Sequence, residues 1–406
     1  MSDPRARRMP NPDLTRAKLF RLLALLWIGG VAIRLPILAI PPILPLIHAD
    51  LHLSETQVGL LVGLPLALFA LAAVAGSLLV SRLGVRLTMM IGLIFTALAS
   101  ASRSLSIDAL TLYAATAATA AGVAVMQPAL PALVRTWVPD RIGLGTAVYT
   151  NGMIIGSTTG PALTIPLMLP FVGGSWRLAL VAWSGCVVLV ACAYETFAPR
   201  SPARTQPDAP PHLWWPDWRN PLIWQLALAF GGTNALFFGA NAFLPDLLVA
   251  EGRADLIAGA LGWLNGSQLI TSFSLLWLAD RVHRRAWPYL VFGPLALAAV
   301  VAIVSSSGGW IVLAAGVLGA TAAVPFVLAL ALPAALSAPG DVHRTAAGMF
   351  SISYAGAVIV PIISGAIWDL SGAAWSAFVP LGLCTVVMTL VGAWLSRRGA
   401  GSVVSA

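Results

Sequence analysis

Charged side chains are scarce in this 406-residue chain: Asp, Glu, Lys and Arg together make up only 9% of it, against 59% hydrophobic residues. A soluble domain carries roughly 25% charged residues, so this chain has too few to cover a water-exposed surface, and lipid must be its solvent. The three cysteines, Cys186, Cys192 and Cys384, lie inside apolar runs without the spacing of metal ligands or of a disulfide framework. We interpret them as packing residues and expect neither a metal nor another cofactor.

Carboxylates and histidines are missing from the middle of the long apolar runs. All 15 acids and all 5 histidines fall in tails, in loops or near the ends of runs. A membrane-embedded enzyme would need a nucleophile beside a base, or metal ligands, at one depth, so the chain is not expected to be an enzyme. The net charge of +8 is spread over short clusters between apolar runs, which indicates membrane topology and no nucleic-acid partner.

Twelve apolar runs are long enough to cross a bilayer as helices, which takes about 20 residues each. They cover residues 19–48, 57–80, 87–106, 109–134, 144–170, 176–195, 220–249, 257–279, 288–306, 310–336, 347–370 and 374–395. No run alternates with a period of two, which argues against a barrel. The sequence therefore predicts an all-α membrane protein with twelve transmembrane helices.

The placement of the 23 Lys and Arg residues predicts the orientation. If both termini are cytoplasmic, all of them lie in cytoplasmic segments except Arg34, inside the first run, and Arg103, Arg177 and Arg253, in outer loops. Basic loops stay on the cytoplasmic side of a membrane. We therefore expect both termini in the cytoplasm and a multi-pass protein of a bacterial-type inner membrane.

The chain repeats itself after roughly 200 residues. SRLGVR (81–86) follows the second run and DRVHRR (280–285) follows the eighth, while Pro131 and Pro333 begin matching segments after the fourth and tenth runs. Duplicated six-helix units are typical of transporters that bind their substrate between the two halves, near the bilayer midplane. The predicted parts are a cytoplasmic tail (1–18), a six-helix bundle (19–195), a cytoplasmic linker (196–219), a second six-helix bundle (220–395) and a cytoplasmic tail (396–406).

The repeated loops resemble the G-x-x-x-D-R-x-G-R-R signature of the major facilitator superfamily. The second copy has the acid and the first has Ser81 in its place. The resemblance implies a cytoplasmic gating motif made of Arg82, Gly84, Arg86, Asp280, Arg281, Arg284 and Arg285. GSTTGP (156–161) is similar to a pattern of antiporters in that superfamily, although small residues at this spacing also simply allow close helix packing.

Within the superfamily, the chain resembles the cyanate and 2-nitroimidazole permease branch. The matching residues are Arg34 and Pro36 with PPILP at 41–45, Gln127 and Pro131, Asn234 with Leu244 and Pro245, and Gln268. The resemblance implies a permease for a small molecule that works as a monomer in contact with membrane lipid.

A permanent cation, Arg34, stands in the middle of the first apolar run. An arginine at that depth costs about 2.5–3.5 kcal/mol on insertion scales, and no carboxylate is expected at the same depth. A guanidinium suits a carboxylate or another small planar anion. We expect the substrate to supply the missing charge, and a lone arginine favours a monoanion. The alternative is that Arg34 only locks helices together through carbonyls, hydroxyls and amides.

Polar side chains on other runs predict the rest of the binding cavity, and the prolines after Arg34 predict a broken first helix that lines it. Taken alone, each polar side chain is better explained by an interhelical hydrogen bond, worth roughly 0.6 kcal/mol, but as a set they describe a neutral, donor-rich cavity around one cation. The expected substrate-binding residues are Arg34, Gln127, Asn234, Gln268, Tyr354, Asn151, Asn241 and Trp27. The predicted function is alternating-access transport of a small organic or inorganic monoanion, cyanate-like or a small carboxylate. Efflux of small aromatic or nitroheterocyclic drugs is the alternative.

Overall fold

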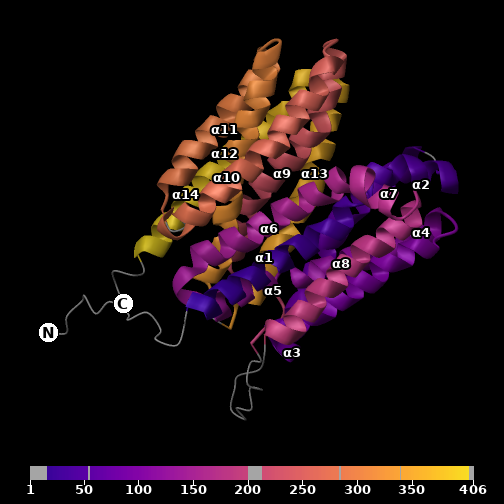
Figure 1. Cartoon of the computed structure of the whole chain (residues 1–406). Coiled ribbons are helices and arrows are strands. Elements are labelled where there is room, and N and C mark those ends of the chain that lie inside the picture. Colours follow the sequence, from indigo (N-terminus) through magenta and orange to yellow (C-terminus); the bar gives the residue numbers. More distant parts are fainter. Residues whose placement is uncertain (1–15, 54, 200–212, 283–284, 339, 402–406) are drawn as a thin grey trace.

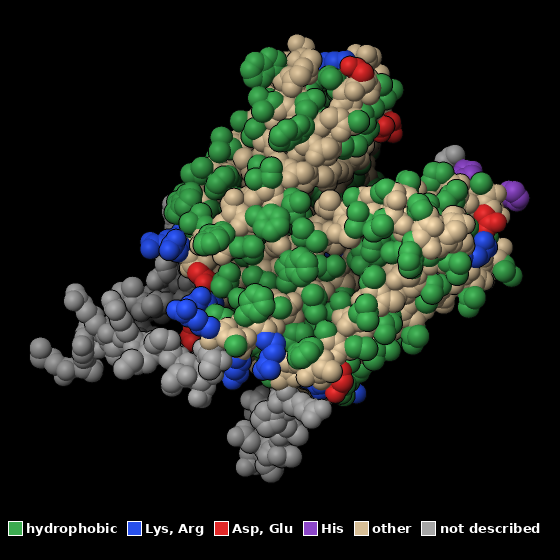
Figure 2. Space-filling model, viewed as in Figure 1, with side chains coloured by type: hydrophobic (Ala, Val, Ile, Leu, Met, Phe, Trp, Pro, Cys, Tyr) green, Lys and Arg blue, Asp and Glu red, His purple; other side chains and the backbone are tan. Residues whose placement is uncertain are grey.

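The computed structural model describes residues 16–53, 55–199, 213–282, 285–338 and 340–401, and within these ranges the chain is helical with short connections and no strand. Ten segments of the described chain are long and apolar enough to cross a membrane. Large apolar side chains cover both lobes of the surface in Figure 2. A surface of this kind suits lipid, and the chain is a multi-pass integral membrane protein with an all-α fold.

The first lobe in Figure 1 contains the helices up to residue 197. They are α1 (Arg16–Leu38), α2 (Leu44–Leu51), α3 (Glu55–Ser102), α4 (Ala109–Met126), α5 (Ala129–Trp137), α6 (Ile142–Leu163), α7 (Leu169–Phe171) and α8 (Trp176–Phe197). The second lobe contains α9 (Pro221–Ala250), α10 (Ile257–Val282), α11 (Trp287–Ser305), α12 (Gly309–Leu336), α13 (Val342–Ser371) and α14 (Phe378–Gly401).

Proline and glycine decide where the helices break. The first predicted run ends as a helix at Leu38 and resumes at Pro41, because Pro41 and Pro42 have no N–H to donate to the preceding turn. The second and third runs form the single element α3, which turns sharply at Gly84 (φ 80°, ψ 162°). That backbone conformation favours glycine, which explains why glycine occupies position 84 in the repeated loop.

Side chains cap several helix starts in the connections. The Asp108 carboxylate accepts a hydrogen bond from the backbone N–H of Thr111 at 2.8 Å, and this bond lowers the pKa of Asp108 below its usual range. Asn220 caps α9 in the same way by accepting from the N–H of Leu222 at 2.9 Å. These bonds satisfy amide groups that the helices themselves leave unpaired.

The two lobes meet through α3 against α13 and through α6 against α10 and α12. Figure 1 shows them in contact at the end where α8 ends and α9 begins, and diverging toward the opposite end. Figure 2 shows a notch between the lobes at that opposite end. We call the two ends the closed end and the open end. The arrangement is a pair of helical bundles with access from one side.

Glycines allow α6 to pack directly on the backbone of α1. A Cβ added at Gly152 would collide with the carbonyl oxygen of Trp27. Gly156 and Gly160, the glycines of GSTTGP, also face the α1 backbone closely. In this structure the motif therefore serves close helix packing, and it fixes the helix that carries Arg34.

We predict that Gly152→Ala lowers the thermal stability of the purified protein, because the new methyl group would force α1 and α6 apart. Overpacking of this kind costs about 1–3 kcal/mol. Gly185→Ala, on α8, is the control, because its Cβ would have no neighbour within 4 Å. It should gain the small advantage of alanine in a helix. Equal melting temperatures for the two variants would contradict the described contact.

Candidate substrate site

Arg34 lies in α1, one turn before the helix ends, and only 9% of the residue is exposed. Its Nη2 donates a hydrogen bond of 3.3 Å to the hydroxyl oxygen of Tyr354 in α13. This bond joins the two lobes. Within the described ranges, none of the ion pairs involves Arg34. The guanidinium therefore has a neutral oxygen as its partner and lacks a carboxylate there.

Aromatic rings surround Tyr354 and keep its surroundings apolar. Its ring centroid lies 5.2 Å from that of Phe69 in α3, 6.4 Å from that of Phe230 in α9 and 6.1 Å from that of Phe350 in its own helix. Electrostatic interactions are stronger in such a setting than in water. An anion that reached Arg34 would bind in a region of low dielectric constant.

Gln127 ends α4, where the chain breaks before Pro128. The residue is 2% exposed, and neither its side-chain oxygen nor its side-chain nitrogen has a hydrogen-bond partner. A buried polar group left unpaired costs about 1–3 kcal/mol. Gln127 therefore presents an amide whose donors and acceptor are free for another molecule.

A chain of hydrogen bonds also links the lobes through Asn151. The indole N–H of Trp27 in α1 donates to Asn151 Oδ1 at 2.8 Å, and Asn151 Nδ2 donates to Ser272 Oγ of α10 at 3.2 Å. Asn151 is fully buried, whereas Trp27 is 37% exposed. The structure thus brings two of the predicted residues together at the boundary between the lobes.

The remaining predicted residues lie on the second lobe. Asn234 Nδ2 donates to Ser353 Oγ at 3.0 Å, one residue before Tyr354. Asn241 accepts from Asn265 at 2.9 Å, and half-buried Gln268 donates to a carbonyl of its own helix at 3.4 Å. None of the described hydrogen bonds joins Asn241 or Gln268 to Arg34 or Tyr354, so these two are less closely tied to the cation.

Arg103 lies in the connection between α3 and α4, as the sequence analysis expects, but the sequence analysis does not show that its side chain is buried. Its side chain is fully buried, its Nη2 donates to the carbonyl of Pro36 at 2.9 Å, and its Nε donates to the carbonyl of Ser100 at 3.2 Å. Both carbonyls lie near the C-terminal ends of α1 and α3, where helix dipoles are negative. Helix ends thus hold this second buried arginine, so Arg34 is not the only cation inside the first lobe. The sequence offered one indication of this burial, because Arg103 falls inside the apolar run 87–106.

In the second-half copy of the repeated loop, Asp280 contacts the start of a helix in the other lobe. Asp280 Oδ1 accepts a hydrogen bond of 2.6 Å from the backbone N–H of Leu144, near the beginning of α6. A carboxylate is favourable at the positive end of a helix, so Asp280 fastens the second lobe to the first at the closed end. Arg281 and Arg285 are exposed, and Arg284 lies outside the described residues.

The first-half copy of the motif lacks this link between the lobes. Ser81 donates to the carbonyl of Leu78 in its own helix. Arg86 instead contacts α8, with its Nη2 2.7 Å from Glu195 Oε2, and Arg82 is exposed. With serine in place of the acid, the two copies therefore make different contacts.

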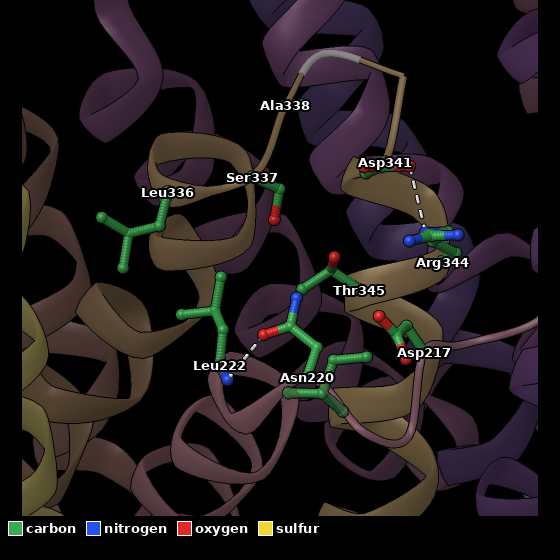
Figure 3. A pocket seen from close by; sticks show the side chains of 10 residues that line it. Asp217, Asn220, Leu222, Leu336, Ser337, Ala338, Asp341, Arg344 and Thr345 are labelled. Carbon is green, nitrogen blue, oxygen red and sulfur yellow. Dashed lines mark hydrogen bonds and ion pairs between the residues drawn. The ribbon is translucent and has the colours of Figure 1, made fainter.

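Two cavities lie away from Arg34. One, of about 110 Å³, is shown in Figure 3 and is formed between the start of α9 and the α12–α13 connection, with the ion pair of Asp341 and Arg344 on its wall. The other, of about 480 Å³, lies between α9 and α13, beside Asp246 and Asp369. Neither is lined by a predicted substrate-binding residue. The candidate site is therefore defined by a buried charge and unpaired polar groups.

Two helical lobes with an apolar exterior, access from one side and a polar boundary define a membrane carrier that moves small solutes between its halves. The chain belongs to the Major Facilitator Superfamily, whose family model matches residues 26–292.

Three bacterial transporters are similar in sequence. YycB of Bacillus subtilis (strain 168) is 27% identical over 279 residues, 68% of each chain. The 2-nitroimidazole transporter of Escherichia coli (strain K12) is 29% identical over 221 residues, 54% of this chain and 55% of the relative. The cyanate transport protein CynX of the same strain is 23% identical over 385 residues, 91% of this chain and 96% of the relative. These relatives support the predicted resemblance to the cyanate and 2-nitroimidazole branch.

Two solved structures share the fold. FucP in the outward conformation superposes with a TM-score of 0.76 at 16% identity, covering 92% of this chain and 98% of its own. The human organic anion transporter MFSD10 superposes with a TM-score of 0.74 at 15% identity, covering 92% and 99%. At such identities the likeness concerns the fold alone.

We predict that Gln127→Leu raises the thermal stability of the purified protein, because leucine is similar in size to glutamine and removes a buried amide that has no partner. The same variant should bind substrate more weakly, because the amide is lost. Asn234→Leu is the matched comparison, since it breaks an existing bond to Ser353 and should lower the melting temperature. Thermal unfolding in detergent measures both. A Gln127→Leu protein that melts below wild type would show that the amide is satisfied.

Proposed function

We propose that this chain is a secondary active transporter that moves a small monoanion by alternating access, with Arg34 as the anion-binding cation. The observation that carries the proposal is a guanidinium, 9% exposed, whose described side-chain partner is the neutral hydroxyl of Tyr354. A full negative charge is a much stronger partner for arginine than a hydroxyl. An arriving anion would therefore gain more from Arg34 than Tyr354 does.

The residues around Arg34 suggest how binding and movement are coupled. An anion entering from the open end would compete with Tyr354 for the guanidinium, and its binding would loosen a bond that joins the lobes. We propose that Gln127, whose amide is unpaired in the same lobe, supplies a further donor. Once the positive charge is neutralised, the lobes rock around the bound anion. A small planar monoanion such as cyanate, or a small carboxylate, fits one guanidinium fork.

We further propose twelve membrane crossings with both termini in the cytoplasm. α3 would cross twice because Gly84 breaks it, and α10, with 26 residues, is long enough for a further crossing. The closed end would then be cytoplasmic, and the described structure would be open to the outside. The tails (1–18 and 396–406) and the linker (196–219) would lie inside the cell, and the two bundles (19–195 and 220–395) would work within one monomer.

A second candidate function is efflux of small aromatic or nitroheterocyclic compounds. It is favoured by the rings of Phe69, Phe230 and Phe350 around Tyr354, which would stack on a flat heterocycle. The name of the 2-nitroimidazole relative points the same way. The two candidates differ in the charge of the substrate, which an uptake assay separates.

We predict that Arg34→Lys and Arg34→Ala each abolish saturable uptake of small anions in proteoliposomes, while both proteins still fold. Alanine removes the charge, and lysine keeps it but loses the two-pronged geometry of the guanidinium. Uptake of labelled cyanate and of a panel of small carboxylates by the wild type and both variants measures this.

The control for these variants is Arg253→Ala. Arg253 lies near the open end, where its described partners are Glu251 and the carbonyl of Ser306, and the variant should transport like the wild type. Unchanged anion affinity in Arg34→Ala would refute the anion site. Saturable movement of 2-nitroimidazole without any movement of anions would favour the second candidate.

A further inference from the structure

The chain that leads into α9 lies against the closed end. We call residues 213–220 the strap. Pro216 of the strap is buried beside α13, where a Cβ added at Gly348 would lie 3.2 Å from the Cβ of Pro216. The indole N–H of Trp224 in α9 donates to the carbonyl of Trp218 in the strap at 2.8 Å. The strap is therefore fixed to two helices of the second lobe.

One side chain of the first lobe is bound to the strap. Ser77 of α3 is fully buried, and its hydroxyl donates a hydrogen bond of 2.6 Å to the backbone carbonyl of Trp214. The same oxygen lies 2.9 Å from Nδ1 of His343 in α13, a residue that is 9% exposed. A hydroxyl has one proton to donate, and the carbonyl receives it. The Ser77 oxygen therefore accepts from the N–H at Nδ1 of His343, and Ser77 joins the first lobe to two groups of the second.

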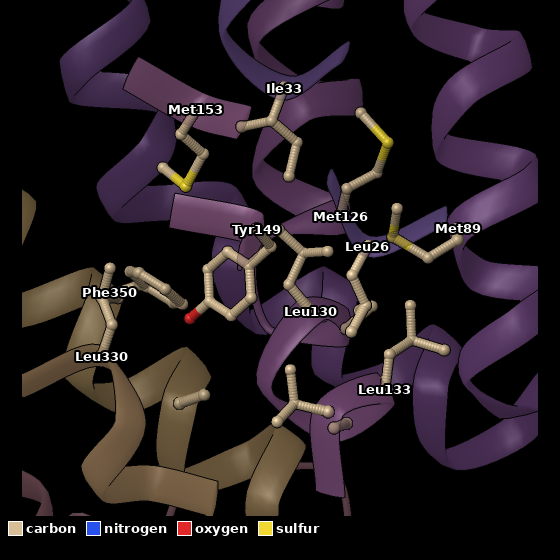
Figure 4. Packing of buried hydrophobic residues seen from close by; sticks show 14 of the residues in the cluster. Leu26, Ile33, Met89, Met126, Leu130, Leu133, Tyr149, Met153, Leu330 and Phe350 are labelled. Carbon is tan, nitrogen blue, oxygen red and sulfur yellow. The ribbon is translucent and has the colours of Figure 1, made fainter. Parts of the chain in front are cut away.

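This polar contact is enclosed by apolar packing that both lobes share. Figure 4 shows Tyr149 of α6 close to Phe350 and Leu330 of the second lobe, within one apolar cluster. Neighbours of Ser77 along α3 and of His343 along α13 belong to the same cluster, namely Ala73, Val80, Val342 and Ala346. Apolar packing has no directional preference, whereas a hydrogen bond requires particular atoms at a particular distance and angle. The contact at Ser77 therefore adds a specific alignment to the packing of the lobes.

Opening of the closed end has to break both bonds of Ser77. The strap and His343 belong to the second lobe, so separation of α3 from α13 removes the hydroxyl from both of its partners. Water then hydrates these groups, whereas in the described state they are enclosed and depend on Ser77. The two bonds thus stabilise one state of an alternating-access cycle and are absent from the other, which is the condition for biasing the equilibrium.

We propose that Ser77, the strap and His343 form a latch that holds the closed end shut. The latch consists of the Ser77 hydroxyl, the carbonyl of Trp214 and the imidazole of His343. It makes the linker a working part of the transport cycle as well as a connection between the two bundles. The inference rests on the alternating access of the proposed function and holds whichever solute is carried.

The experiment measures how often the closed end opens. The reporter is Val327→Cys on α12, a position 1% exposed in the same apolar cluster as Ala147 of α6, with the three native cysteines replaced by alanine. The full chain in nanodiscs is labelled with N-ethylmaleimide without any substrate, and the rate follows the population in which the lobes are apart. A second reporter, Leu318→Cys on the same helix, is 1% exposed in a cluster formed within the second lobe. It detects general unfolding.

Ser77→Ala should speed labelling at Val327→Cys about tenfold, because only the described state loses the two bonds. Labelling at Leu318→Cys should not change. Ser81→Ala is the matched control, one turn further along α3. The Ser81 hydroxyl donates to the carbonyl of Leu78 in the same helix at 2.8 Å, a bond that both states keep, so this variant should label like the wild type.

Gly348→Ala tests the strap separately. The new methyl group would press on Pro216 and move the strap away from Ser77, and it would also meet the side chain of Ile223 at 2.8 Å. This variant should likewise speed labelling at the boundary. Its control is Gly356→Ala on the same helix, where the added Cβ would have no neighbour within 4 Å and should have no effect.

Unchanged labelling at Val327→Cys in the Ser77→Ala protein would overturn the proposal, because the two bonds would then not hold the lobes together. Equally faster labelling at Leu318→Cys would also overturn it, because the protein would be unfolding and not opening. An effect of Ser77→Ala without any effect of Gly348→Ala would contradict the role of the strap. The assay contains no substrate, so a failure of the anion-transport proposal leaves this result readable.

Discussion

The central constraint in this structure is a buried arginine, Arg34, that has no carboxylate partner within the described chain. Arg34 is placed between the lobes by α1, which α6 fixes through glycine contacts. The described chain offers it a tyrosine hydroxyl from the opposite lobe and no ion pair. The hydroxyl stabilises the buried guanidinium only partly, because it carries no full negative charge. The guanidinium therefore remains able to bind an anion. Arg103, the second buried arginine of this lobe, differs from Arg34 because its described bonds go to carbonyls near two helix ends.

The polar contacts between the lobes are individually weak hydrogen bonds. They include single hydrogen bonds from Arg34 to Tyr354, from Asn151 to Ser272 and from the N–H of Leu144 to Asp280. Interhelical hydrogen bonds in membranes average about 0.6 kcal/mol, so each of these bonds adds little to the stability of the described state. Such a boundary holds one state without trapping it, which is what a carrier that alternates between two states needs.

The sequence was sufficient for the fold class and for the family, because hydrophobic length, basic loops and repeated motifs are properties of the chain itself. It also predicted a break in the first helix from its prolines. It assigned Trp27 and Asn151 to the same cavity but did not predict the hydrogen bond between them. It placed Arg103 in a connection but did not show its burial, since counting charges in loops does not reveal that two helix ends meet at one guanidinium. Helix boundaries such as the turn inside α3 depend on backbone conformation at Gly84.

The parts of the site that the sequence left open depend on contacts between distant residues. Gln127 and Asn234 are both amides in apolar runs, yet one is unpaired and the other is bonded to Ser353. Nothing in local composition distinguishes the two amides. Packing between helices decides which polar groups stay free, and those groups are the candidates for a role in binding.

The most direct test is to supply the missing charge from the protein itself. Tyr354→Glu would place a carboxylate beside Arg34, whereas Tyr354→Gln has nearly the same shape without the charge. Binding of labelled cyanate to each purified variant is measured in detergent. The account predicts that the glutamine variant still binds the anion and the glutamate variant does not, because its own carboxylate occupies Arg34. Equal binding by both variants would contradict the account.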